Sequence, residues 1–261
     1  MFTLFTGRLE NRLARTPISS KVNERTSNEI AHANEVREMF SNIAGRYDLL
    51  NHLLSANIDK RWRRRVKAVL EETLNDKDAV VLDVACGTGD LSLELASGSN
   101  ATIFGSDFCR PMLAIAADKA GKAAIPVPFV EADALDLAFA DDTFDAVTIA
   151  FGLRNLSNVA DGLAELRRVL KPGGKLVILE FSTPVVPGFK SLFNLYFTQI
   201  LPRIGGVVSG SRGAYQYLPD SVRKFPDQKG LAAMMTETQF VNVGFKNVTG
   251  GIAAIHSGLK K

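Results

Sequence analysis

The segment with the clearest chemical signature is an apolar run followed by a glycine-containing turn, VVLDVACGTGDL at residues 80–91. Gly87 and Gly89 stand in the turn, where glycine lets a ligand approach the backbone and adopts positive φ at little cost. A second apolar run, ATIFGSD, ends in Asp107. This order predicts a nucleoside bound over the carboxyl ends of parallel strands, with the second acid on the ribose hydroxyls.

The start of the helix after the turn argues against a phosphate-containing ligand. Dinucleotide sites usually carry a third glycine near the pyrophosphate, but Ser92 stands near that position. Asp90 already supplies the negative charge that a helix N-terminus attracts. The predicted cofactor is therefore a cationic nucleoside, S-adenosylmethionine. The alternative is a purely structural strand-to-helix turn in another doubly wound protein.

The composition fits one α/β domain with an appendage, since 46% of the 261 residues are hydrophobic and 23% are charged. Residues 1–27 are predicted to form a flexible tail ahead of a single domain at 28–261. No apolar run reaches the ~18 residues that span a bilayer, and the first residues do not resemble a signal peptide. A net charge of +3 is too small to indicate a nucleic acid partner.

The cysteines and histidines do not indicate a disulfide framework or a metal site. With only Cys86 and Cys109, a reducing cytoplasmic location is expected. No His/Cys cluster has the spacing of metal ligands, so no metal is predicted.

Strands and helices are expected to alternate along most of the chain. The predicted strands are almost continuously apolar, as in a sheet buried on both faces, and they span residues 80–84, 102–106, 127–131, 145–151 and 175–181. The predicted helices span residues 28–42, 55–74, 90–96, 111–120, 159–170 and 226–238. This alternation predicts a doubly wound, mostly parallel sheet with right-handed crossovers. Two short runs around Thr249-Gly250-Gly251 predict a C-terminal antiparallel strand pair.

The segment at about 188–225 interrupts this alternation. It is aromatic and apolar at 189–204 and rich in Gly, Ser and Tyr at 205–219, which predicts a helix followed by a loop. Two interpretations stay open: an insertion that covers the predicted binding site together with the N-terminal helices, or a helix that simply packs on the sheet.

The order of these motifs resembles that of the class I SAM-dependent methyltransferases, which have a Rossmann-like sheet closed by an antiparallel strand pair. More specific segments resemble the UbiE/MenG family of quinone C-methyltransferases, and these are YDLLN at 47–51 with Trp62, FGLRN at 151–155, RVLKPGG at 168–174 and YLPDSVRKFP at 217–226. The resemblance covers roughly residues 35–258.

The resemblance implies methyl transfer from S-adenosylmethionine to a ring carbon of a polyprenylated quinol in menaquinone or ubiquinone biosynthesis, with demethylmenaquinol the first candidate substrate. Asp133 would accept a hydrogen bond from the adenine amino group. The implied cofactor residues are Asp83, Gly87, Thr88, Gly89, Asp107, Asp133 and Ala134. Two alternatives remain: methylation of another small molecule, or a non-catalytic SAM-binding scaffold.

The candidates for acceptor chemistry are polar residues of the family-like segments, and they are Tyr47, Asp48, Asn51, Arg154 and Asn155. Arg154 follows the fourth strand, at the edge of the sheet where ligands bind, and could stabilise a phenolate. A structural salt bridge is the alternative for this residue. His256, in a predicted edge strand, is either a base or a structural histidine.

The basic run at residues 60–67, KRWRRRVK, has two interpretations. It could attract anionic lipid, which would suit a membrane-dissolved quinol and peripheral association with the inner face of the membrane. It could equally be a solvated helix face. The oligomeric state stays open at this point, a homo-oligomer included.

Overall fold

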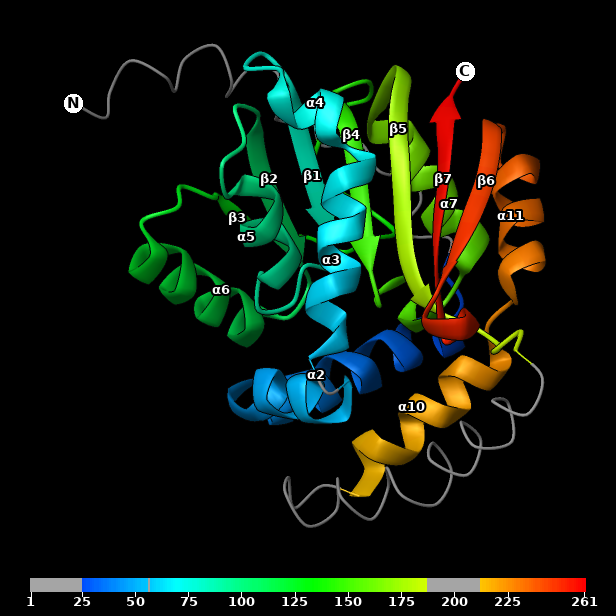
Figure 1. Ribbon diagram of the computed structural model, residues 1–261. Helices are drawn as coiled ribbons and strands as arrows, with labels where there is room; N and C mark the ends of the chain where they lie inside the picture. Colours follow the sequence, from blue (N-terminus) through cyan, green and yellow to red (C-terminus); the bar gives the residue numbers. More distant parts are fainter. Residues whose placement is uncertain (1–24, 56, 187–211) are drawn as a thin grey trace.

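The computed structural model describes residues 25–186 except residue 56, together with residues 212–261 (Figure 1). Side chains are described for all of these except residues 49–55 and 212–216. Seven strands form one sheet in the order β3-β2-β1-β4-β5-β7-β6. Their bounds are β1 Val80–Val84, β2 Thr102–Asp107, β3 Phe129–Glu131, β4 Phe144–Ala150, β5 Leu170–Phe181, β6 Phe240–Val248 and β7 Ala253–Lys260.

The pairing of the strands confirms the predicted sheet. Strands β1 to β5 pair in parallel, whereas β7 is antiparallel to both β5 and β6. From β1 the chain proceeds outward to β2 and β3 and then returns to β4 on the other side of β1. The carboxyl ends of β1 and β4 therefore form a topological switch point, which is where ligands bind in open α/β sheets.

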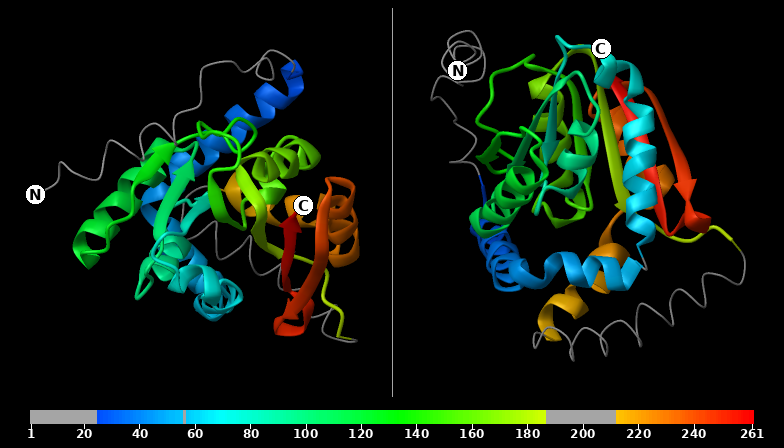
Figure 2. Two further views of the ribbon diagram at one scale, coloured as in Figure 1. Left: turned by 90° about the horizontal axis from the view of Figure 1, so that it is seen from above. Right: turned by 60° about the vertical axis from the view of Figure 1, so that its left-hand side comes forward.

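Helices cover both faces of the sheet (Figures 1 and 2). Helices α3 and α5 lie over one face, α7 and α11 lie over the other, and α6 packs beside β2 and β3. The helix bounds are α2 Ser27–Ser55, α3 Ile58–Val69, α4 Glu71–Asn75, α5 Asp90–Ala96, α6 Arg110–Ala123, α7 Val159–Val169, α10 Arg212–Lys224 and α11 Gln228–Glu237. Two short 3-10 helices are η2 Leu153–Asn155 and η4 Thr249–Gly251.

Two apolar cores follow from the alternation of side chains along the strands. In β1, Val81 packs with Trp62 and Leu95 on the α3/α5 face. Its neighbour Leu82 faces the other way and belongs to the core that contains Leu166 of α7. Successive side chains of a strand point to opposite faces, so a continuously apolar strand supplies both cores.

Helix α2 runs below the carboxyl ends of the parallel strands (Figures 1 and 2). Its start is a capping box: the Thr26 amide donates to Glu29 Oε2 (2.8 Å), and the Glu29 amide donates to Thr26 Oγ1 (3.2 Å). A helix at 28–42 followed by a polar turn was predicted. The predicted end of the helix was wrong, because the helix continues to Ser55. The second predicted helix, 55–74, is divided between α3 and α4.

Three other predictions differ from the structure. The loop predicted at 205–219 is helical from Arg212 on, where α10 begins. This helix contains Pro219 in its interior. Strand β5 begins at Leu170 rather than Lys175, since its first residue pairs with Phe144 across a register shift in β4. His256 does not lie in an edge strand, because β7 is enclosed between β5 and β6.

The aromatic stretch 189–204 lies outside the described residues. In the part of the chain that the structure describes, no helix is both long and apolar enough to cross a membrane.

Candidate active site

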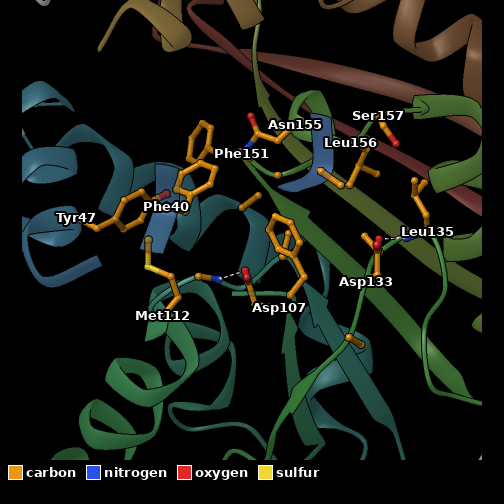
Figure 3. Close-up of a pocket in the computed structure, with 18 residues that line it drawn as sticks. Phe40, Tyr47, Asp107, Met112, Asp133, Leu135, Phe151, Asn155, Leu156 and Ser157 are labelled. Carbon is orange, nitrogen blue, oxygen red and sulfur yellow. Dashed lines mark hydrogen bonds between the residues drawn. The ribbon is translucent and has the colours of Figure 1, made fainter. Parts of the chain in front are cut away.

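A pocket lies at the carboxyl ends of β1, β2 and β4, below the switch point (Figure 3). It encloses about 750 Å³ of space, including its opening to solvent. Its walls come from α2, the glycine turn, the ends of β2 and β4, the segment after β3 and η2.

Asp107, the last residue of β2, brings a carboxylate to the pocket although the residue is only 6% exposed. Its two oxygens accept hydrogen bonds from the backbone amides of Gly87 and Cys109, both at 2.8 Å. Burial raises the pKa of Asp107 from its ordinary value, and these amide donors partly oppose that rise. A carboxylate offers about four acceptor sites, so Asp107 can also accept from the hydroxyls of a ribose.

The glycine turn meets the pocket at Gly87, which has a φ of 55°. A Cβ there would have only the Tyr47 ring within 4 Å, at 3.8 Å, so the conformation rather than crowding favours glycine. Gly89 is constrained by packing, because a Cβ there would lie 2.9 Å from the Ala116 Cβ. Gly89 does not line the pocket but lets α5 approach α6.

A second acid of the pocket, Asp133, lies near the end of β3. Asp133 and Ala134 follow β3 and both line the wall (Figure 3). Asp133 Oδ1 accepts from the Leu135 amide (2.9 Å), and Oδ2 accepts from Arg25 Nη1 (2.7 Å). Asp107 and Asp133 thus present acceptors from adjacent strands, which suits the hydroxyls and the amino group of a nucleoside.

Two other predicted cofactor residues support the turn and do not line the pocket. Asp83 is buried and accepts hydrogen bonds from Ser92 Oγ (2.6 Å) and Thr148 Oγ1 (2.8 Å). Thr88 is also buried and donates to Asp48 Oδ1 at 2.5 Å.

Asp83 makes the stability of the fold depend on pH. Burial, with a smaller contribution from the charge of Asp107, raises the pKa of Asp83 from 3.8 to about 6. Between these values the folded protein holds a proton that the unfolded chain has released, so stability decreases as pH rises through this window. At about 1.4 kcal/mol per pH unit, the decrease amounts to about 3 kcal/mol.

We therefore expect the Asp83→Asn substitution to remove this contribution. Urea unfolding of both proteins from pH 4 to pH 7 measures it. The free energy of unfolding of the wild type, minus that of the variant, should fall by up to about 3 kcal/mol over this range. A difference that stays constant with pH would show that Asp83 has an ordinary pKa.

Phe151 lines the pocket on the side away from Asp107 (Figure 3). Its backbone is strained. Its φ is 57°, which is rare for a bulky side chain and costs energy that the surroundings must offset. The Phe151 amide donates to the Leu179 carbonyl (2.8 Å). Its carbonyl accepts from Arg154 Nη1 (2.5 Å) and Asn155 Nδ2 (3.2 Å), and these contacts hold the conformation.

Arg154 lies behind this wall and is not among the residues that line the pocket. Its Nη1 is 2.7 Å from Glu180 Oε1, and the two side chains are only 7% and 1% exposed. The guanidinium carbon also lies 5.3 Å from the centre of the Phe181 ring. The structure thus contains the ion pair of the alternative interpretation, and it shows Arg154 in contact with the pocket wall through the Phe151 carbonyl.

The other acceptor candidates are divided between the pocket and its supports. Tyr47 and Asn155 line the pocket (Figure 3). Asp48 instead forms an ion pair with Lys119 (2.9 Å), which also binds Asp90. The side chain of Asn51 lies outside the described part of the chain.

Sequence reasoning did not single out Tyr217 of α10, whose hydroxyl donates to Asn155 Oδ1 at 3.1 Å. Its place in the segment YLPDSVRKFP was the available signal. Because Asn155 Nδ2 donates to the Phe151 carbonyl, the two contacts fix the orientation of this amide. One N–H of Asn155 remains for a ligand.

His256 does not belong to the pocket. Its Nε2 lies 2.8 Å from the Gln228 carbonyl oxygen, its ring packs on Phe245, and burial lowers its pKa. The structural interpretation therefore applies to this histidine. Among the described residues, no group of three or more His, Cys, Asp or Glu side chains could hold a metal ion.

The basic run on α3 is partly used inside the protein. Arg63 forms ion pairs with Asp59 (2.6 Å) and Asp90 (3.2 Å), and Trp62 is buried. The remaining exposed cations are Lys60, Arg61, Arg64 and Arg65. Contact of these cations with lipid stays a prediction.

Solved structures with a similar fold include a magnesium protoporphyrin IX methyltransferase from Synechocystis PCC 6803 with bound SAM, at a TM-score of 0.59 and 16% identity. The match covers 88% of this chain and 97% of that one. A SAM-dependent methyltransferase from Aquifex aeolicus matches with a TM-score of 0.55 and 20% identity, over 75% and 89% of the two chains. At these identities the likeness concerns the fold, and it confirms the class I methyltransferase architecture.

Curated relatives are much closer in sequence. A demethylmenaquinone methyltransferase of Thermus thermophilus is 50% identical over 221 residues, which are 84% of this chain and 99% of the relative. One of Deinococcus radiodurans is 49% identical over 227 residues, 87% of this chain and 92% of the relative. The ubiquinone/menaquinone biosynthesis C-methyltransferase UbiE of Geobacter sulfurreducens is 46% identical over 233 residues, 86% and 88% of the two chains.

A family model matches almost the whole of the described domain, from residue 27 to residue 260. The pocket at the switch point, with one acid at the end of β2 and another after β3, agrees with this match, and so do relatives at about half identity. The chain therefore belongs to the ubiE/COQ5 methyltransferase family.

Proposed function

We propose that this protein transfers a methyl group from S-adenosylmethionine to a ring carbon of a polyprenylated quinol, with demethylmenaquinol as its preferred substrate. The observation that carries the proposal is the division of one pocket into two unlike walls (Figure 3). One side carries the carboxylates of Asp107 and Asp133, and the other carries the aromatic rings of Phe40 and Phe151. The names of the relatives from Thermus and Deinococcus support the choice of quinol.

The polar wall fits the cofactor. When bound, S-adenosylmethionine supplies an electrophilic methyl group on a positively charged sulfur. Asp107 would accept from the ribose hydroxyls, Asp133 would accept from the adenine amino group, and the Gly87 backbone would lie against the ligand. The buried Asp107 carboxylate already accepts two backbone amides, so it is held in a fixed position before any ligand arrives.

The apolar wall fits the quinol. A phenol has a pKa near 10 in water, so forming the more reactive phenolate needs help from the site. A dry pocket favours a reaction between a phenolate and a sulfonium, because opposite charges neutralise each other as the new bond forms. Phe40, Phe151 and Leu156 would exclude water from the ring. Tyr47 and the remaining N–H of Asn155 are two polar groups of the lining that could bind a quinol oxygen.

Arg154 contributes to this wall through its neighbours. Together with Asn155 it holds the Phe151 carbonyl, and Glu180 in turn fixes the guanidinium. We therefore assign Arg154 as a positioning residue, which keeps Phe151 and η2 where the acceptor ring would lie. Alignment of the ring carbon with the methyl group is expected to supply much of the rate enhancement.

The proposal predicts that the reduced quinol is methylated and that the oxidised quinone is not. Only the quinol has a phenolic proton to lose and an electron-rich ring. The test incubates the protein anaerobically with isotope-labelled S-adenosylmethionine and demethylmenaquinone, with and without a reductant, and identifies the product by mass spectrometry. Label should enter the ring only in the reduced sample.

A parallel incubation with a demethylated polyprenyl benzoquinol distinguishes the two substrate classes. Preference for this compound would assign the protein to benzoquinol methylation. Equal ring methylation with and without reductant would contradict the carbon-nucleophile mechanism. Binding of the cofactor without methylation of either quinol would instead favour a different small-molecule acceptor or a scaffold role.

A further inference from the structure

The side chain of Arg25, two residues before α2, reaches the cofactor side of the pocket. Arg25 precedes the Thr26–Glu29 capping box, which fixes the direction in which the chain enters the helix. Its Nη1 lies 2.7 Å from Asp133 Oδ2, and the two side chains are 17% and 27% exposed. Since Asp133 lines the pocket, Arg25 touches the binding site through this carboxylate.

Helix α2 lines the pocket and is attached on both sides of it by side-chain hydrogen bonds. Ala33, Phe40 and Tyr47, spaced seven residues apart, lie on one helix face and line the pocket. Next to Tyr47, Asp48 binds Thr88 of the glycine turn. Arg25 provides the corresponding attachment at the start of the helix, 108 residues from Asp133 in the sequence.

We propose that Arg25 is a positioning residue of the cofactor site: it orients the Asp133 carboxylate toward the adenine amino group and closes that end of the pocket. This inference rests on the proposed contact between Asp133 and adenine. The Leu135 amide holds Oδ1, and Arg25 holds Oδ2. Two of about four acceptor sites on the carboxylate remain for a ligand. Without Arg25, a single backbone contact would hold this partly exposed side chain.

The ion pair between Arg25 and Asp133 affects which base the site prefers. An ionised carboxylate can only accept hydrogen bonds, and Arg25 fixes the direction in which Asp133 presents its oxygens. The amino group of adenine is a donor, whereas hypoxanthine has a carbonyl oxygen at the same position, which a carboxylate repels. Arg25 should therefore strengthen the preference for adenine over hypoxanthine, and its effect should depend on Asp133.

The test measures binding of S-adenosylhomocysteine and S-inosylhomocysteine by calorimetry. We expect the wild type to prefer the adenine compound by at least about tenfold, because the inosine compound loses the donor to Asp133 and places a carbonyl oxygen against its carboxylate. Arg25→Ala should reduce this ratio of affinities about fivefold, and Arg25→Lys should reduce it less. Effects of this size are expected for a partly exposed ion pair. In methyl transfer, Arg25→Ala should raise the KM for S-adenosylmethionine while kcat stays within about twofold.

Matched variants separate a positioning role from a merely structural one. Arg223 of α10 forms an exposed ion pair with Asp220, so Arg223→Ala should leave both affinities unchanged. In the background of Asp133→Ala, the additional change Arg25→Ala should have no further effect on the preference.

The outcomes distinguish this inference from the proposal that it rests on. If Asp133→Ala loses the preference and Arg25→Ala keeps it, Arg25 only anchors the helix and the inference is overturned. If Asp133→Ala itself keeps the preference, the proposed adenine contact is wrong, and the inference falls with it. Arg25→Ala could also reduce the preference equally in the wild-type and in the Asp133→Ala background. This result would overturn the inference, because the effect of Arg25 would not pass through this carboxylate.

Discussion

Replacing Arg154 by alanine is expected to lower the turnover of the quinol by about 10²-fold, while the affinity for S-adenosylmethionine changes little. The substitution removes the guanidinium that binds the Phe151 carbonyl, and Phe151 has a φ of 57° that needs such support. A displacement of about 1 Å in a reacting group can cost this factor. Arg154→Lys retains the charge but not the planar fork, so its loss should be smaller but measurable.

The same substitution leaves the Glu180 carboxylate buried without its partner, which costs stability as well as activity. The expected cost is about 3–5 kcal/mol. Arg168 offers a matched control, because it pairs with Glu165, which is also 1% exposed, and none of its hydrogen-bond partners lines the pocket. Arg168→Ala should show a comparable loss of stability with normal turnover per folded molecule.

Steady-state kinetics, calorimetry with S-adenosylmethionine and thermal unfolding together decide the role of Arg154. If turnover falls equally in the Arg154 and Arg168 variants, the effect reflects instability alone. Near wild-type turnover in a folded Arg154→Ala protein would show that the position of Phe151 does not limit the reaction.

Replacing Asp107 by alanine is expected to weaken binding of S-adenosylmethionine by about 1–3 kcal/mol, or about 5- to 150-fold in Kd. The carboxylate is almost fully buried at the pocket wall, and ribose hydroxyls without this acceptor would be left unpaired. Because burial raises the pKa of Asp107, the affinity of the wild type should also fall as pH drops through that raised value, while the variant should not show this decline.

Asp145 provides the control for Asp107. It also accepts a backbone amide, that of Val80 at 2.9 Å, but it lies near the start of β4, at the opposite end of the sheet from the pocket. Asp145→Ala should therefore leave Kd unchanged. Unaltered affinity in a folded Asp107→Ala protein, measured by calorimetry, would remove Asp107 from the cofactor site.

Local patterns in the sequence determined the sheet and the place of the site. The bounds of β1 and of α5 agree with the prediction, because a short apolar run and a glycine turn are strong local signals. The carboxyl ends of parallel strands meet at one edge of the sheet. The order of strands and helices therefore also predicted that Gly87, Asp107 and Asp133 lie close together. The structure places all three in one pocket with Tyr47 and Asn155.

Local composition was a poor guide where tertiary contacts override it. The Gly/Ser/Tyr-rich stretch predicted a loop, yet α10 begins within it, and Tyr217 binds Asn155 from this helix. Strand β5 likewise extends through Pro172, Gly173 and Gly174, which usually end an element. Pairing with neighbouring elements supplies the energy that propensity lacks.

Tertiary structure alone decided which of the chosen side chains line the pocket. Asp83 and Thr88 belong to the right motif but point to Ser92 and Asp48, and Arg154 points to Glu180, 26 residues away. Arg25, assigned to a flexible tail by its position, finds Asp133 across the fold. A sequence pattern fixes residue types and strand ends, whereas the partner that each buried charge finds depends on contacts between segments far apart in the chain.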